Sequence, residues 1–305
     1  MIDRVLVIKL GALGDFIQAL GPMQAIREAH PDAFIALLTT AHFVDFARAT
    51  PWFNEVLVDD RKRDIGSWWA LRRMLRAGNY GRVYDLQTSD RTGWYFRVMG
   101  PRRRPEWSGI VKGASHRHDN PARDRMHTLE RQAEQLAIAG IPSVPPPDLS
   151  WVTANLNRFD LGQRYAMLVP GASAHRPAKR WHIGRYAELA RDIASRGVRP
   201  VVVGTKEEHE LGRFIAVRCT DARDITGRTS LLELFALARS ASGAVGNDSG
   251  PMHMAAMGGA PSVVLFSAES DPALCAPRGP RVTILRRNEL TGLAVAEVAA
   301  ALRLR

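Results

Sequence analysis

The fold is decided by Val245-Gly-Asn-Asp-Ser-Gly-Pro-Met-His253, where an apolar strand runs into a short polar turn. Pro251 stands where the first residue of a helix is expected. A helix that begins in this way points free backbone N–H groups and the positive end of its dipole at its N-terminus. The stretch therefore predicts a site for a phosphate or pyrophosphate. The candidate ligands lie in the turn and in the first helical turn: Asp248, Ser249, Gly250 and His253.

A second stretch of similar design lies near the N-terminus. Lys9-Leu-Gly-Ala-Leu-Gly-Asp15 follows an apolar run at 5–8 and precedes a segment with helical spacing of apolar residues. It lacks the Gly-x-Gly-x-x-Gly fingerprint, and the next strand does not end in the acidic residue that would hold a dinucleotide ribose, so a dehydrogenase is disfavoured. Asp15 is either a helix N-cap or a general base, since open α/β sheets carry their sites at the carboxyl ends of strands.

Apolar runs alternate with helical patterns along the chain, which is typical of an α/β protein with parallel sheets. Strands are expected at 5–8, 34–38, 56–58, 82–86, 165–169, 198–203, 225–227, 244–247 and 262–266. Helices are expected at about 15–29, 41–49, 66–77, 125–139, 184–196, 206–218, 230–239 and 291–303. The basic region between Arg97 and Arg125, which includes Arg102 and Arg103, is interpreted as irregular.

A proline-rich segment at 142–148 is the best candidate for a linker between domains. The sequence therefore predicts two Rossmann-like domains, 1–148 and 149–305, that face a central cleft. The last helix belongs either to the second domain or packs back on the first.

The 305 residues carry a formal net charge of +11, which comes mainly from arginine. This charge indicates either an anionic partner, such as an acidic lipid, a polyanionic substrate or nucleic acid, or codon bias. No recognition-helix signature supports nucleic acid. The two cysteines and nine histidines show no metal-ligand spacing, so no metal site is predicted. Without a signal-like or membrane-spanning apolar run, a cytoplasmic protein is expected.

Two further loops carry candidate residues. Ser173 and Lys179, in a loop after the expected strand 165–169, either meet a donor phosphate or belong to a solvated charged loop. Glu208 follows another strand and either satisfies a helix dipole or binds ribose hydroxyls. The helix around Trp68 and Trp69 is interleaved with arginines, and it is either a core helix with a solvated face or a membrane-surface helix.

Taken together, these stretches resemble glycosyltransferase family nine, the bacterial ADP-heptose:lipopolysaccharide heptosyltransferases. The resemblance covers nearly the whole chain, in order. It is carried by five stretches: Val5–Asp15, Asp85-Leu-Gln87, Pro170-Gly-Ala with Lys179-Arg-Trp181, Ile225–Leu231, and Gly246–His253.

The resemblance implies a GT-B fold, with the acceptor on the N-terminal domain and the nucleotide sugar on the C-terminal one. It implies an inverting, metal-independent transfer in which Asp15 is the general base. Lys179 would stabilise the departing diphosphate, Glu208 would reach the nucleoside and Thr229 would lie near the base. No cofactor is expected beyond the co-substrate ADP-heptose. The acceptor would be an anionic glycolipid at the inner face of the inner membrane, and the residues predicted to bind it are Gly14, Gln87, Arg91 and Arg117.

This sequence departs from the family pattern at three places. Ser249 replaces a threonine, His182 replaces a proline, and residues 266–272 read Phe-Ser-Ala-Glu-Ser-Asp-Pro where the family has Phe-Gly-Pro-Thr-Asp-Pro. The last loop borders the donor in the family, so a different nucleotide sugar in another surface-glycan pathway remains an alternative. A second alternative is a non-catalytic module that binds nucleotide sugars or nucleic acid.

Overall fold

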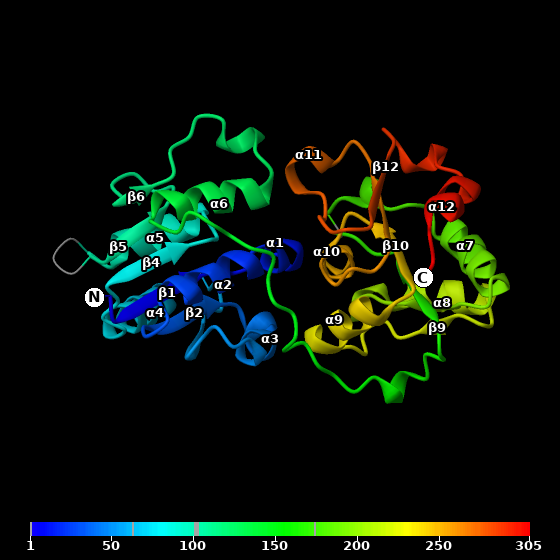
Figure 1. Ribbon diagram of the computed structural model, residues 1–305, viewed down its shortest axis with the longest axis horizontal. Coiled ribbons are helices and arrows are strands. Elements are labelled where there is room, and N and C mark those ends of the chain that lie inside the picture. Colours follow the sequence, from blue (N-terminus) through cyan, green and yellow to red (C-terminus); the bar gives the residue numbers. More distant parts are fainter. Residues whose placement is uncertain (1, 63, 101–103, 174) are drawn as a thin grey trace. The chain divides into compact units, whose positions relative to one another are not determined.

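The computed structural model describes residues 2–62, 64–100, 104–173 and 175–305 (Figure 1). The chain folds into two compact units, Met1–Trp151 and Val152–Arg305. The division falls three residues after the predicted boundary. Arg102 and Arg103 lie outside the described residues.

The first unit is built on a six-stranded, wholly parallel sheet with the order β3-β2-β1-β4-β5-β6. This is the Rossmann order, in which the winding reverses between β1 and β4. The strands are β1 (Arg4–Ile8), β2 (Phe34–Thr39), β3 (Glu55–Val58), β4 (Arg82–Asp85), β5 (Glu106–Gly109) and β6 (His116–Arg117).

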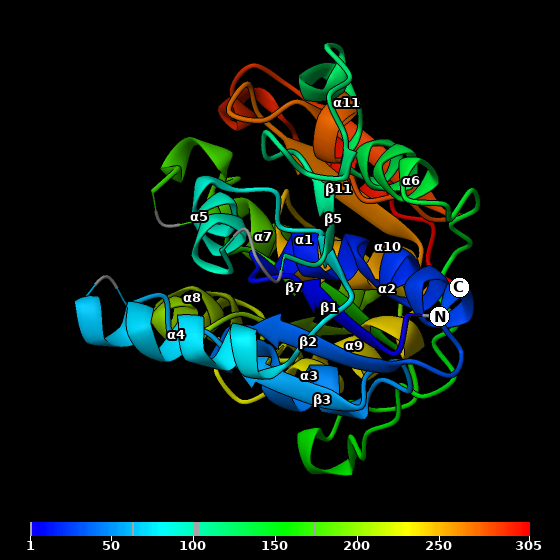
Figure 2. The same ribbon diagram turned by 90° about the vertical axis from the view of Figure 1, so that its left-hand side faces the viewer.

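Helices cover both faces of this sheet. They are α1 (Leu13–Gln18), α2 (Leu20–Ala29), α3 (Val44–Ala49), α4 (Ile65–Ala77), α5 (Asp90–Val98) and α6 (Thr128–Ile138). Figure 2 shows α4 and α5 on one face and α1, α2 and α6 on the other. Alternate strand residues such as Leu6 and Ile8 pack with Leu71 and Leu75 of α4 in the core, as the two-residue period of a strand requires.

The second unit repeats this design. Its parallel sheet has the order β12-β11-β10-β7-β8-β9, so the winding reverses between β7 and β10. The strands are β7 (Tyr165–Val169), β8 (Arg199–Val202), β9 (Arg223–Asp224), β10 (Gly243–Asn247), β11 (Ser262–Phe266) and β12 (Val282–Arg286). All residues of β7, β10 and β11 are buried. This burial explains why the sequences of these strands consist almost wholly of apolar and small residues.

The helices of the second unit are α7 (Ile183–Ser195), α8 (His209–Arg218), α9 (Leu231–Ser240), α10 (Gly250–Met257), α11 (Pro272–Cys275) and α12 (Val295–Ala301). The last helix, α12, packs against α7, and its Val298 and Ala299 belong to the core of this unit. The apolar face of this helix therefore contributes to the core of the second unit.

Most predicted elements are present, but the structure differs from the prediction in several places. The strand β9 ends at Asp224, before the strand expected at 225–227, and the helices α5 and α11 were not expected. The helix expected at 15–29 is divided into α1 and α2 at Ala19, whose N–H bonds to Phe16 and Ile17 close the first helix. The region interpreted as irregular contains β5 and β6, which are too short and too polar to show strand periodicity. The strand β12 was not predicted, because its side chains are half-buried or exposed.

The proline-rich segment lies along the first unit. Asp148 donates its N–H to Gln24 Oε1 of α2 (2.6 Å), and the Trp151 ring packs edge-on against Phe46 and Trp52. These contacts explain why the first unit ends at residue 151. No helix in the described part of the chain is both long and apolar enough to cross a bilayer.

Candidate active site

Four of the predicted site residues lie at the two points where strand order reverses. Asp15 follows β1 and Gln87 follows β4, which are neighbours in the first sheet. Lys179 lies in the loop after β7, and Asp248 follows β10, its neighbour in the second sheet. Ligands of doubly wound α/β folds bind at such reversal points, outside the carboxyl ends of the strands.

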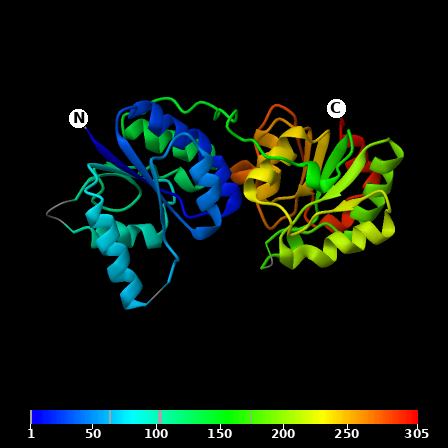
Figure 3. The same cartoon turned by 90° about the horizontal axis from the view of Figure 1, so that it is seen from below.

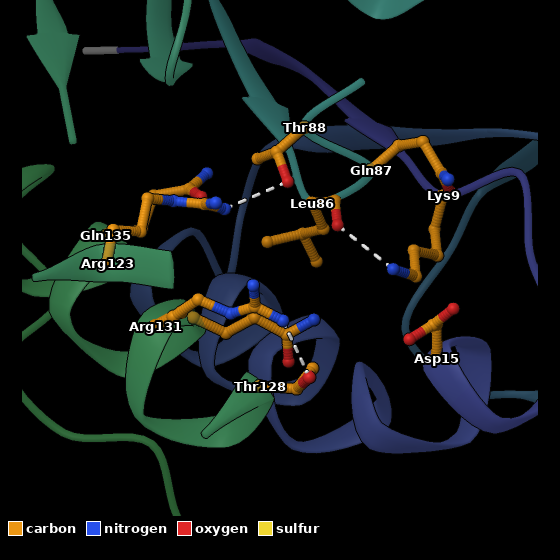
Figure 4. A pocket seen from close by; sticks show the side chains of 10 residues that line it. Lys9, Asp15, Leu86, Gln87, Thr88, Arg123, Thr128, Arg131 and Gln135 are labelled. Carbon is orange, nitrogen blue, oxygen red and sulfur yellow. Dashed lines mark hydrogen bonds between the residues drawn. The ribbon is translucent and has the colours of Figure 1, made fainter. Parts of the chain in front are cut away.

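Asp15 lies in the first turn of α1 and is exposed. Its carboxylate points toward the ammonium group of Lys9 across a cavity of about 220 Å³ (Figure 4). Asp15 is the one carboxylate among the residues that line this cavity. It makes no side-chain cap for α1, whose N-cap position is Ala12. The N-cap interpretation is therefore wrong, since a residue in the helical turn itself cannot occupy that position.

Lys9 is buried and donates from Nζ to the carbonyl of Leu86 (3.1 Å). Burial lowers the pKa of its ammonium group, while the negative charges of Asp15 and Asp85 act in the opposite direction. Burial also raises the pKa of Asp85 to about 6, although this carboxylate accepts the N–H groups of Thr88 (2.9 Å) and Gln87 (3.1 Å). The buried ammonium group of Lys9 is thus stabilised by the charges of two carboxyl groups, of which Asp15 lines the cavity.

Helix α6 supplies one wall of the cavity, and the sequence prediction missed its residues. Thr128, Arg131, Gln132 and Gln135 line it together with Arg123, which precedes the helix. Arg123 donates to Thr88 Oγ1 (3.0 Å) and Arg131 to Thr128 Oγ1 (2.9 Å) (Figure 4). A detectable signal was present: polar residues recur at helical spacing on the face of α6 that turns inward.

The predicted acceptor residues have different surroundings. Gln87 lines the cavity, and its Oε1 accepts the N–H of Leu10 (2.8 Å). Gly14 lies in α1 beside Asp15. Arg91 and Arg117 are not among the lining residues. Arg91 pairs with the buried Asp59 (2.8 Å), and Arg117 is exposed on β6.

Asn247 organises the candidate donor site in the second unit. Its side chain is fully buried at the end of β10, where it accepts the N–H of Trp181 (2.9 Å) and donates to the carbonyl of Pro170 (2.8 Å). These two bonds fasten the loop after β7 to the neighbouring strand. As a result, Lys179 Nζ lies 2.5 Å from Asp248 Oδ2, with both side chains largely buried.

Removal of the Asn247 side chain should therefore weaken both stability and ligand binding. Asn247→Ala is expected to destabilise the protein by about 2–4 kcal/mol, because it leaves a buried N–H and a buried carbonyl without partners. Thermal unfolding measures this loss, and Asn288→Ala, in an exposed loop, is the matched control. Equal melting temperatures for the two variants would contradict the role of Asn247.

The N-terminus of α10 has no side-chain cap. Ser249 occupies the N-cap position, but its hydroxyl donates to the carbonyl of Asn247 (3.0 Å) and makes no bond to the helix. The side chain of Ser249 therefore does not cap this helix. Gly250 begins the helix and His253 lies buried in it. A helix end without a side-chain cap can accept an anion on its backbone N–H groups.

The other predicted donor residues follow β7, β8 and β9. The Glu208 carboxylate fills the space beside Gly171 and Gly204, where a Cβ on either glycine would overlap it. It also accepts the N–H of Thr205 (2.8 Å), so it caps its 3₁₀ helix as well as lying at the strand ends. Ser173 is exposed, and Thr229 is half-buried just before α9. In the ranges that the structure covers, no three acidic, histidine or cysteine side chains cluster as metal ligands.

Comparisons with known proteins match nearly the whole chain. A family model described as glycosyltransferase family 9 (heptosyltransferase) matches residues 68–297. Lipopolysaccharide heptosyltransferase 2 of Escherichia coli (strain K12) is 26% identical over 314 residues, which cover 93% of this chain and 88% of that relative.

Solved structures give the same result for the fold. E. coli ADP-heptose lipopolysaccharide heptosyltransferase II has a TM-score of 0.79 at 24% identity, covering 98% of this chain and 97% of its own. E. coli heptosyltransferase WaaC, solved with ADP, has a TM-score of 0.78 at 20% identity, with coverage of 97% and 98%. These likenesses confirm the predicted GT-B fold class with two Rossmann-like domains.

Proposed function

Because this chain belongs to glycosyltransferase family 9, the heptosyltransferases, we propose that it transfers heptose from ADP-heptose to an acceptor in the core of lipopolysaccharide. One observation carries the proposal: each of the two sheets presents reactive side chains at its own reversal point. The first offers an exposed carboxylate among cations, and the second offers an anion-binding helix end beside a lysine.

In the proposed reaction, Asp15 takes the proton of an acceptor hydroxyl. The acceptor oxygen forms a bond to the anomeric carbon of heptose from the face opposite the diphosphate, and the bond from that carbon to the diphosphate oxygen breaks. ADP leaves with the electron pair, and the configuration of the anomeric carbon inverts. Asp15 suits the role of base because it is exposed and makes no cap bond to its helix.

On the donor side, Lys179 and the N-terminus of α10 would bind the diphosphate and stabilise the charge that develops as ADP departs. They would do so without a metal ion. Ser173, Ser249, Gly250 and His253 belong to the same proposed subsite. Glu208 would meet the ribose hydroxyls and Thr229 would lie near the adenine. The E. coli heptosyltransferase of the same fold was solved with ADP, which supports an adenine nucleotide as the ligand of this chain.

On the acceptor side, Lys9, Arg123 and Arg131 would bind the acidic groups of the lipopolysaccharide core. Gln132 is buried in the cavity wall, and its Oε1 has no hydrogen-bond partner among the described residues, so it is available for a sugar hydroxyl. Gln87 and Gly14 complete this proposed subsite. We place the enzyme at the inner face of the inner membrane, where a glycolipid acceptor would be presented.

The proposal is tested by calorimetric titration of the protein with ADP, UDP and GDP in the presence of a chelator. Selective binding of ADP is expected, since Glu208 and the loop before α9 would form a site for adenosine. A preference for UDP or GDP would overturn the heptose assignment, and loss of ADP binding on chelation would overturn metal independence.

A different sugar on ADP is a second candidate, and the loop after β11 favours it. This loop departs from the family pattern, and here the carbonyl of Glu269 accepts from Arg176 (3.3 Å) while the buried Ser270 Oγ has no hydrogen-bond partner in the described structure. Turnover of ADP-heptose against ADP-hexoses separates the two candidates, since only the preferred sugar should give a high kcat/KM.

A further inference from the structure

Helix α4 carries an apolar and basic stripe on its outward face. Ile65 and Trp69 are one turn apart and are 78% and 63% exposed, and Arg73 and Arg76 continue the stripe toward the C-terminus. The inward face carries Leu71 and Leu75, which are buried in the core. The helix is therefore apolar on both sides, although only one side has a partner within the unit.

Helix α5 packs against α4 and repeats the combination. Arg72 of α4 donates to the carbonyl of Val98 in α5 (3.1 Å), and Trp68 packs edge-on against Tyr95. Trp94 of α5 is 53% exposed. Three of the six large apolar side chains that are exposed in the described structure thus belong to these two adjacent helices.

Each exposed tryptophan has an arginine over its ring. The guanidinium carbon of Arg72 lies 5.3 Å from the ring centroid of Trp69, and that of Arg97 lies 4.8 Å from the centroid of Trp94. Between Ile65 and Ala77 the sequence has three arginines and no acidic residue. An ordinary solvated helix face mixes both signs of charge and does not expose tryptophan.

We propose that the α4–α5 surface, defined as Ile65, Trp69, Arg72, Arg73, Arg76, Trp94 and Arg97, docks on a bilayer that contains anionic phospholipid. Tryptophan prefers the boundary between headgroups and acyl chains, because its ring is apolar while its N–H is polar. Arginine extends its apolar stem along that boundary and places its charge among lipid phosphates. The inference rests on the proposed function only for the presence of a lipid-linked acceptor.

A second copy of the chain fits this surface less well. An isologous contact would bring the arginines of α4 against themselves, with no acidic residue in the helix to pair with them. In Figure 3, α4 is the light-blue helix at the outer edge of its unit. Ile65, at its N-terminal end, is the most exposed of the large apolar side chains that the structure describes. A helix at the edge of its unit can insert its apolar side chains into the boundary between lipid headgroups and acyl chains, at the shallow depth of an interfacial helix.

Sedimentation with large unilamellar vesicles tests the proposal. The full chain is compared on vesicles of phosphatidylglycerol with phosphatidylethanolamine and on vesicles of phosphatidylcholine alone. Ile65→Ser/Trp69→Ala is expected to weaken partition by at least about tenfold, because both apolar contacts with the bilayer are lost. Arg73→Glu/Arg76→Glu should weaken binding to the anionic vesicles only, and the remaining binding should fall with salt.

The matched control is Val217→Ser/Arg213→Glu on α8, which removes an equally exposed apolar side chain and the same kind of charge from the second unit. Partition that is unchanged in the α4 variants, or that is lost equally in the control, would overturn the proposal. So would a concentration-dependent dimer in wild type that Trp69→Ala abolishes, since that would identify a second copy as the partner.

A soluble acceptor separates this proposal from the proposed function. The α4 variants should keep wild-type kcat/KM on a deacylated, lipid-free core oligosaccharide and lose rate only on acceptor embedded in vesicles. If wild type fails to use the soluble acceptor, the proposed function is overturned, while the vesicle measurements still decide whether this surface binds lipid.

Discussion

Asp15→Asn is expected to lower kcat by about 10²–10⁴-fold, the range that general-base catalysis usually contributes. The variant keeps the size and most of the hydrogen bonding of the side chain, so KM for both substrates should change little. The reason is local: Asp15 is exposed and is the one carboxylate among the residues lining its cavity, so no neighbouring lining residue can replace it as the base. Steady-state rates of ADP release measure the effect.

Asp45→Asn is the matched control, because Asp45 is also an exposed carboxylate in the first turn of a short helix in the same unit. It should leave kcat unchanged. Near-wild-type turnover in Asp15→Asn would remove Asp15 from the mechanism. If kcat stays unchanged and only the KM for the acceptor rises, Asp15 would instead be a residue that binds the acceptor.

Lys179→Met is expected to weaken ADP binding and to lower kcat by about 10²–10³-fold, the usual cost of losing one preorganised electrostatic contact in a transition state. The methionine keeps the apolar stem and removes the charge. It also leaves Asp248 largely buried without its partner, which by itself repels a diphosphate. Lys206→Met, at an exposed lysine in the same unit, is the control.

The double variant Lys179→Met/Asp248→Asn separates these two effects. If Lys179 only neutralises Asp248, removal of both charges should restore ADP binding measured by calorimetry. If Lys179 contacts the diphosphate, the double variant should bind as weakly as the single one. We expect the second result, because the uncapped N-terminus of α10 lies beside Asp248 and would place an anion next to the ammonium group.

Strand positions were predictable where burial is complete on both faces. Val5–Ile8, Tyr165–Val169 and Ser262–Phe266 appear in the sequence as unbroken runs of apolar and small residues. By contrast, β6 has only two residues, and β12 has no fully buried residue and an irregular order of half-buried and exposed positions, so neither shows a clear period. The break between α1 and α2 was not predicted, although the sequence carries a signal for it: Pro22 has no N–H to donate to the carbonyl of Gln18, so a helix cannot continue unbroken through it.

The candidate site was predictable where a reactive side chain lies in the turn or first helical turn after a predicted strand. Asp248 directly follows β10, and Asp15 lies in the first turn of the helix after β1, so local chain geometry places both side chains. The cations of the first cavity were harder to predict, because Arg123 and Arg131 lie more than a hundred residues from Asp15 in sequence and reach it only through packing of α6 on α1. The ion pair of Arg91 with the buried Asp59 could likewise not be identified from the sequence.

The matching strand orders of the two sheets bear on how this chain can evolve. Under the proposed assignment, the residues for the acceptor come from loops of one sheet and those for the nucleotide sugar from loops of the other. Selection for a new glycan can then alter the first half of the gene without disturbing the half that recognises ADP. Recombination near the codons for Trp151 and Val152 would exchange whole specificities in a single event.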